Sequence, residues 1–167
     1  LREIPIRDIR DVETMAALDA EAKAVLDLPE RIADAFTGLV YSGGSAKEIE
    51  KSLVSLGVDA DHIAQGDSER LSKLDAEARR ALALDALGGR TRHPFHWPLE
   101  YPEVFQRGKG GFDVILGNPP FLGGRKIRGA LGGRYLDYLT SRFGEDSSGG
   151  ADLCAFFFLS AHQLGCS

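Results

Sequence analysis

The sequence predicts an α/β protein that is rich in helix overall and has an all-helical N-terminal part. Apolar residues recur at helical spacing over residues 7–89. A short apolar run at 112–116 is followed by Gly-Asn-Pro-Pro, which is typical of a buried strand ending in a rigid turn. We therefore divide the chain into a helical insertion or bundle, residues 1–90, and a second segment, residues 91–167.

The first segment is expected to hold several helices. Asp11 can cap a helix that starts at Val12, and Pro29 suits the first turn of a second helix. Residues 45–48 have the spacing of a capping box, which predicts a third helix ending near Gly57. A longer helix is expected to start at Asp67 or Ser68 and to end before Gly88.

The second segment begins with a connector in which prolines alternate with aromatic residues, so we expect a packed but irregular chain over residues 90–111. After the predicted strand, glycines indicate a loop to about Ala130, followed by a helix to about Phe143. Asp152 is placed to cap a last, strongly apolar helix that runs to Leu164.

Composition excludes several protein classes. The chain has 167 residues, 43% hydrophobic and 27% charged, which is an ordinary balance for a globular protein. No apolar run reaches the roughly 18 residues of a membrane span. The two cysteines form no metal-binding or disulfide pattern, so we expect no metal and a cytoplasmic location. Because residue 1 is leucine, we expect the chain to be a fragment.

The net charge of −5 conceals an asymmetry between the two segments. Residues 1–90 carry 12 basic and 18 acidic residues, whereas residues 91–167 carry 8 and 7. Five basic residues follow the Gly-Asn-Pro-Pro sequence within residues 122–142, against one acidic residue, Asp137. A nucleic-acid backbone could pass there, although a solvated surface gives the same pattern.

The residues after the predicted strand point to one kind of target. Asn118 supplies a carboxamide, Pro119 a backbone carbonyl and Phe121 an aromatic ring, while Pro120 leaves the chain few conformations. Ligands of open α/β sheets bind at the carboxyl ends of strands. Hydrogen-bond acceptors beside an aromatic face suit a flat, amine-bearing heterocycle or an amide.

This stretch, Asp113 to Phe121, resembles the catalytic motif of amino-methylating DNA methyltransferases. Together with residues 96–105 and 122–126, it is similar to the adenine methyltransferases of restriction-modification and phage-defence systems. The resemblance implies a fragment of a Rossmann-like fold that uses S-adenosylmethionine. It also implies double-stranded DNA as substrate, restriction or defence-system subunits as partners, and no membrane.

The resemblance further implies roles for individual residues. Asn118 and Pro119 would accept hydrogen bonds from the amine of a flipped adenine, Phe121 would stack on its ring, and Pro120 would stiffen the link. Arg125, Lys126 and Arg128 are candidate phosphate contacts.

The glycine-rich turn that mainly binds the cofactor in such enzymes is absent from this chain. Asp113 and Phe156 remain candidate cofactor contacts, and for Phe156 core packing is the stronger interpretation. We therefore expect this fragment alone to be inactive and its apolar surface to favour self-association.

Two alternatives stay open. A protein glutamine methyltransferase has a similar motif because a glutamine amide presents the same N–H groups. Since the cofactor turn is missing, a non-catalytic helical or DNA-contact module is the other alternative. A cytosine amine as the target is a variant of the first interpretation.

Overall fold

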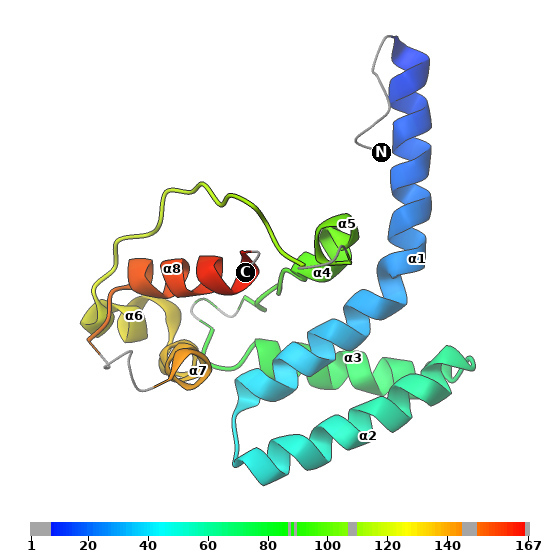
Figure 1. Ribbon diagram of the computed structural model, residues 1–167. Helices are drawn as coiled ribbons and strands as arrows, with labels where there is room; N and C mark the ends of the chain where they lie inside the picture. Colours follow the sequence, from blue (N-terminus) through cyan, green and yellow to red (C-terminus); the bar gives the residue numbers. More distant parts are fainter. Residues whose placement is uncertain (1–7, 87, 89, 107–109, 145–149, 166–167) are drawn as a thin grey trace.

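The protein is a set of helices joined by turns and one long extended segment (Figure 1). A computed structural model describes residues 8–86, 88, 90–106, 110–144 and 150–165. The helices within these residues are α1 (Ile9–Ser42), α2 (Ala46–Ala64), α3 (Ser68–Leu82), α4 (Trp97–Glu100), α5 (Pro102–Phe105), α6 (Gly124–Leu131), α7 (Gly133–Phe143) and α8 (Leu153–Leu164).

Helix α1 is continuous over 34 residues, so the expected division at Pro29 is wrong. Its N-cap is Asp8, and Asp11 lies in the first turn as the capping-box partner. Pro29 lies inside the helix, where it has no N–H to donate to the carbonyl of Val25. Figure 1 shows α1 changing direction along its length, and proline is an ordinary cause of such a bend. Apolar contacts after the bend keep the second half helical.

Helices α2 and α3 pack against the second half of α1. Ser45 and Glu48 form the predicted capping box at the start of α2, and Asp67 caps α3. Gly57 does not end α2, because the helix continues to Ala64. The three helices enclose a hydrophobic core whose buried members are Ala35, Leu56, Ile63, Leu74 and Ala78.

The connector forms two one-turn helices, α4 and α5, around a cluster of aromatic rings. The rings of Trp97 and Tyr101 stack with centroids 5.8 Å apart. Phe112 meets both of them edge-on and also contacts Phe105 at 5.5 Å. The cluster therefore holds the start of the extended segment that follows.

The last three helices build a second hydrophobic core. Its buried members are Ile127 from α6, Leu136 and Leu139 from α7, and Phe156 from α8. Residues 124–130 were expected to be part of a loop, but they belong to α6, whose Ile127 is fully buried in the core formed with α7 and α8.

Arg92 links the two cores. Its guanidinium donates to the carbonyls of Leu84 and Leu131, each at 2.7 Å, and so joins the residues after α3 to the end of α6. It also lies over the Tyr41 ring at 4.8 Å and near the Tyr135 ring at 6.0 Å. Burial raises the pKa of both tyrosines, and the positive charge of Arg92 opposes that effect.

The predicted α/β, Rossmann-like fold is wrong for the residues that the structure describes. They contain no strand or sheet, and the only sheet-like pairing among them is an isolated parallel bridge between Phe112 and Gly165. A strand needs a neighbouring chain to bond with its N–H and C=O groups. Over residues 113–121 no ladder of hydrogen bonds to a neighbouring strand forms with the described residues, so an apolar pattern alone did not produce a strand. The expectation that the chain is helix-rich is confirmed.

No helix within the described residues is both long enough and apolar enough to span a membrane.

Candidate functional site

The predicted catalytic residues lie on an extended segment that arches over helix α8 (Figure 1). We call residues 113–121 the strap. At its start, the backbone N–H of Phe112 donates to the carbonyl of Leu164 at 2.8 Å, at the end of α8. The bridge to Gly165 and the aromatic cluster hold the same point. The strap is therefore fixed where it begins.

The other end of the strap is fixed at the start of α8. The backbone N–H of Leu122 donates to Oδ1 of Asp152 at 3.2 Å, and its carbonyl accepts from Leu153 N at 2.9 Å. Asp152 is also the N-cap of α8, because the same Oδ1 accepts from Cys154 N at 2.9 Å. One carboxylate thus caps the helix and holds the chain that follows Phe121.

The middle of the strap rests on α8 at Gly117. A methyl group added at this glycine would lie 2.7 Å from Cζ of Phe157, a distance that real side chains do not tolerate. The backbone therefore passes directly over the Phe157 ring. Asn118 is the next residue, so the contact between Gly117 and Phe157 restrains the backbone directly before it.

The side chains of the motif face outward. Asn118 and Pro120 are exposed, and Pro119 is half-buried. The Phe121 ring is 78% exposed, and Leu116 and Val114 are 92% and 70% exposed. Large apolar side chains at such exposure are available to contact another molecule. The carboxamide of Asn118 and the ring of Phe121 are both accessible to a ligand that approaches the strap.

The two candidate cofactor contacts lie in different surroundings. Asp113 is exposed at the start of the strap. Phe156 is only 2% exposed and packs in the second core, with its ring 5.9 Å from that of Phe143. Asp113 is accessible to a small molecule, whereas Phe156 supports the helix beneath the strap.

The three candidate DNA contacts lie on α6, which begins three residues after Phe121. Arg125, Lys126 and Arg128 are all exposed. Arg128 pairs with Asp137 of α7 at 3.2 Å, and both side chains are more than 60% exposed. A pair this exposed is worth little in water, so it leaves Arg128 available to another anion.

Two features of the site escaped the sequence analysis. Asp152 was predicted only as a helix cap, and Phe157 was not singled out. The capping spacing of Asp152 is a local signal, whereas its bond to Leu122 joins residues 30 positions apart. Nothing in a single sequence marks such a contact.

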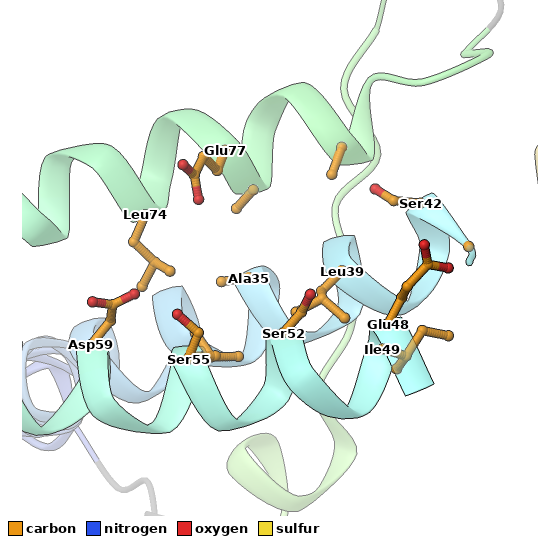
Figure 2. Close-up of a pocket in the computed structure, with 14 residues that line it drawn as sticks. Ala35, Leu39, Ser42, Glu48, Ile49, Ser52, Ser55, Asp59, Leu74 and Glu77 are labelled. Carbon is orange, nitrogen blue, oxygen red and sulfur yellow. The ribbon is translucent and has the colours of Figure 1, made fainter. Parts of the chain in front are cut away.

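A separate hollow of about 370 Å³ lies between α1, α2 and α3 (Figure 2). Its carboxylates are engaged by the chain itself. Glu48 accepts from Ser45, which lowers the pKa of Glu48, and Asp59 pairs with Arg70. Glu77, the third acidic residue that lines the hollow, lies 4.0 Å from the ammonium of Lys73. Each acidic side chain described around the hollow therefore has a partner within the chain. Across the described residues, no set of three histidine, cysteine or acidic side chains is placed to hold a metal ion.

Residues 44–167 match the model of a family described as Eco57I restriction-modification methylase. The matched range covers all helices from α2 to α8, and it includes the strap. No curated protein and no solved structure matches the chain.

Proposed function

Because the chain belongs to the Eco57I restriction-modification methylase family, we propose that it is part of a site-specific DNA adenine methyltransferase. The observation that carries this proposal is the exposed strap, with Asn118, Pro119 and Phe121 in sequence on a backbone tied to α8. The methyl group would be transferred from S-adenosylmethionine to the exocyclic amine of a flipped adenine.

Asn118 and Pro119 account for activation of the amine. The lone pair of an adenine amine is conjugated with the ring, which makes the nitrogen a weak nucleophile. The Asn118 side-chain oxygen and the Pro119 carbonyl would each accept one N–H of the amine. Two acceptors at a fixed separation favour a tetrahedral nitrogen whose lone pair is free to attack a methyl carbon. This is catalysis by positioning and preorganised dipoles.

Phe121 accounts for holding the base. An adenine must leave the duplex before its amine can react. The 78% exposed ring offers a face on which the extruded base can stack, a contact worth about 1–3 kcal/mol. Pro120 keeps the distance between ring and acceptors constant because its φ angle is fixed.

The cofactor is the least complete part of the proposal. When bound, S-adenosylmethionine supplies an activated methyl group. The exposed carboxylate of Asp113 suits a hydroxyl or ammonium group of that molecule, and Phe156 would support the site from the core. Because the main glycine-rich turn is absent from these residues, we propose that the full-length protein is active and that this fragment alone is not.

The basic residues on α6, the helix that follows the strap, would contact DNA phosphates. They are Arg125, Lys126 and Arg128. Such contacts orient the duplex without reading its sequence. Double-stranded DNA is thus the proposed substrate, with restriction or defence-system subunits as proposed partners, a cytoplasmic location, and self-association of the fragment through its exposed apolar side chains.

We also propose that residues 1–90 form a helical insertion and that residues 91–167 form part of the catalytic region. The support is the separation of the two hydrophobic cores, one within α1–α3 and the other within α6–α8. The family match starts at residue 44 and so includes two helices of the first region.

The test replaces Asn118 by alanine in the full-length protein, with a labelled methyl donor and duplex DNA. We expect methyl transfer to fall by at least about a hundredfold, as when a preorganised polar group is removed, with DNA affinity nearly unchanged. Gln163→Ala, which removes an exposed amide on α8, is the matched control and should retain activity.

Retained transfer by Asn118→Ala would refute the assignment of the site. Labelling of a release factor instead of DNA would favour the protein glutamine methyltransferase. Base analysis of the product would distinguish adenine from cytosine. Tight binding of S-adenosylmethionine by these 167 residues alone would count against a non-catalytic module.

A further inference from the structure

We infer that Asp152 is a positioning residue for the methyl transfer proposed above, because its carboxylate fixes the chain directly after Phe121. The inference rests on the proposed function and extends it to a residue outside the motif. Asp152 touches neither the base nor the cofactor in this scheme. It would act through the backbone of the strap.

The contacts around Leu122 carry the inference. Its N–H donates to Asp152 Oδ1, and its C=O accepts from the N–H of Leu153. Both polar groups of one peptide residue are therefore held by two consecutive residues at the start of α8. Beside this point, a Cβ at Gly124 would lie 2.7 Å from the carbonyl oxygen of Ala151, so the chains are in close contact.

The strap transmits this restraint to Asn118. Only three residues separate Asn118 from Leu122, and two of them are prolines with fixed φ. On the other side, Gly117 rests on the Phe157 ring. Asn118 thus lies between the contact of Gly117 with Phe157 and the hydrogen-bonded Leu122. Without the bond from Leu122 to Asp152, the Asn118 and Pro119 oxygens would be free to move.

The role differs from ordinary helix capping. Asp67 caps α3 in a comparable way, accepting from Arg70 N at 3.0 Å, but it lies in the first region and has no contact with the strap among those of the described residues. Replacing Asp67 therefore removes a helix cap without removing a hydrogen bond to the chain after the strap. This provides a matched control in the same chain.

The experiment compares three variants of the full-length protein: Asp152→Ala, Asp152→Asn and Asp67→Ala. A displacement of about 1 Å can cost a hundredfold in rate. We expect Asp152→Ala to lower kcat about ten- to a hundredfold while KM for DNA changes less than about threefold. Asp152→Asn keeps the Oδ1 acceptor of both bonds and should restore most of kcat, and Asp67→Ala should leave kcat unchanged.

Deuterium exchange of the backbone amides over residues 116–122 gives a readout that needs no activity. We expect faster exchange at Leu122 in Asp152→Ala, because its N–H loses its acceptor, and no change there in Asp67→Ala. If the wild-type protein transfers no methyl group to DNA, the proposed function fails, and the exchange result still decides whether Asp152 fixes the strap.

Two outcomes would overturn the inference. One is an unchanged kcat and an unchanged exchange rate in Asp152→Ala. The other is an equal loss of kcat in Asp152→Ala and Asp67→Ala, because both variants would then act only through stability.

Discussion

At position 117 the strap comes so close to α8 that any larger residue would require the Phe157 ring or the strap to shift. Gly117 therefore does more than allow a turn. Its lack of a Cβ sets how deep the strap lies above the Phe157 ring. The height of Asn118 over the helix depends on the same contact, because Asn118 is the next residue.

We predict that Gly117→Ala lowers the rate of methyl transfer by at least about tenfold, since the added methyl group must lift the strap or displace Phe157. Overpacking of this kind costs about 1–3 kcal/mol in stability. Single-turnover rates and thermal unfolding of the full-length protein would measure both effects.

Gly123→Ala is the control for this prediction, because a Cβ at Gly123 meets nothing within 4 Å and its backbone suits any residue. Equal rates for the two variants would show that the close contact at Gly117 has no influence on the site. In a Gly117→Ala/Phe157→Leu double variant, part of the rate should return.

The residues of the motif could be predicted from sequence because their chemistry is contiguous. Asn118, Pro119, Pro120 and Phe121 are neighbours, so their proximity needs no fold. The contacts of Asp152 and Phe157 with the strap could not be predicted. They arise only when α8 packs beneath residues that precede it by about 30 to 40 positions.

Among the helices, local signals predicted some boundaries and missed others. The expected ends at Phe143 and Leu164 are confirmed, whereas the first helix begins at Ile9 and not at Val12. The caps at Ser45, Asp67 and Asp152 were correct because the side chain bonds to N–H groups two or three residues away. Pro29 and Gly57 were taken as boundaries but lie inside helices, although proline costs about 3 kcal/mol and glycine about 1 kcal/mol at such positions. Burial of apolar side chains of α1 and α2 in the first hydrophobic core therefore keeps both helices continuous through these residues.

The capping box of α2 leads to a prediction about pH. Hydrogen bonds from the side chain and backbone of Ser45 hold the pKa of Glu48 below its ordinary value. A depressed folded-state pKa adds stability at pH values above the unfolded pKa, and that stability is lost as pH falls through the folded pKa. Acidification below about pH 4.3, the ordinary pKa of Glu, should therefore destabilise α2.

The measurement is the thermal midpoint of the chain, followed by circular dichroism between pH 6 and pH 2.5. In Glu48→Gln the acid-induced fall in midpoint should be smaller, because the amide still accepts the Ser45 bonds but does not titrate in this range. Glu69→Gln, an acidic residue in the first turn of α3, is the control. Identical pH profiles for wild type and Glu48→Gln would contradict the prediction.

At the scale of the whole molecule, Arg92 makes the most contacts described above between the two hydrophobic regions. Its side chain reaches the carbonyls of Leu84 and Leu131 and lies over the Tyr41 ring. Asp85 adds a second link by accepting from the N–H of Arg134 in the first turn of α7. Two further contacts join α1 to α7: Arg134 donates to the carbonyl of Ser42, and the rings of Tyr41 and Tyr138 lie 5.9 Å apart.

We predict that Arg92→Ala lowers the free energy of unfolding by about 3 kcal/mol, because charged hydrogen bonds to partly buried carbonyls are lost. Unfolding should also become less cooperative, with the two cores separating. Arg92→Lys should recover only part of the loss, since an ammonium cannot reproduce the planar fork. Denaturant unfolding followed by near- and far-UV circular dichroism would test this.

Arg79→Ala is the matched control, because the exposed side chain of Arg79 bonds, among the described residues, only to Asp75 one turn earlier in α3. It should change stability by less than about 0.5 kcal/mol. Coincident, equally stable transitions in Arg92→Ala and Arg79→Ala would show that the cores are joined by other contacts.

The overall architecture was the least predictable level. The helical content followed from periodicity, but the expected sheet did not form in the described residues, because a strand is defined by its neighbours and not by its own side chains. The apolar stretch that was expected to be a strand contacts helix α8 instead. The same residues still display the motif at the surface.

Because the strap is attached to both ends of α8, the length of that helix determines the distance between the two ends of the strap. Its 12 residues at about 1.5 Å each give a length of about 18 Å between the anchors. Removing one residue would shorten this length and rotate the downstream half of the helix by about 100°. A substitution on the exposed side of α8 leaves this length unchanged, whereas an insertion or deletion in the helix would alter the geometry of the strap.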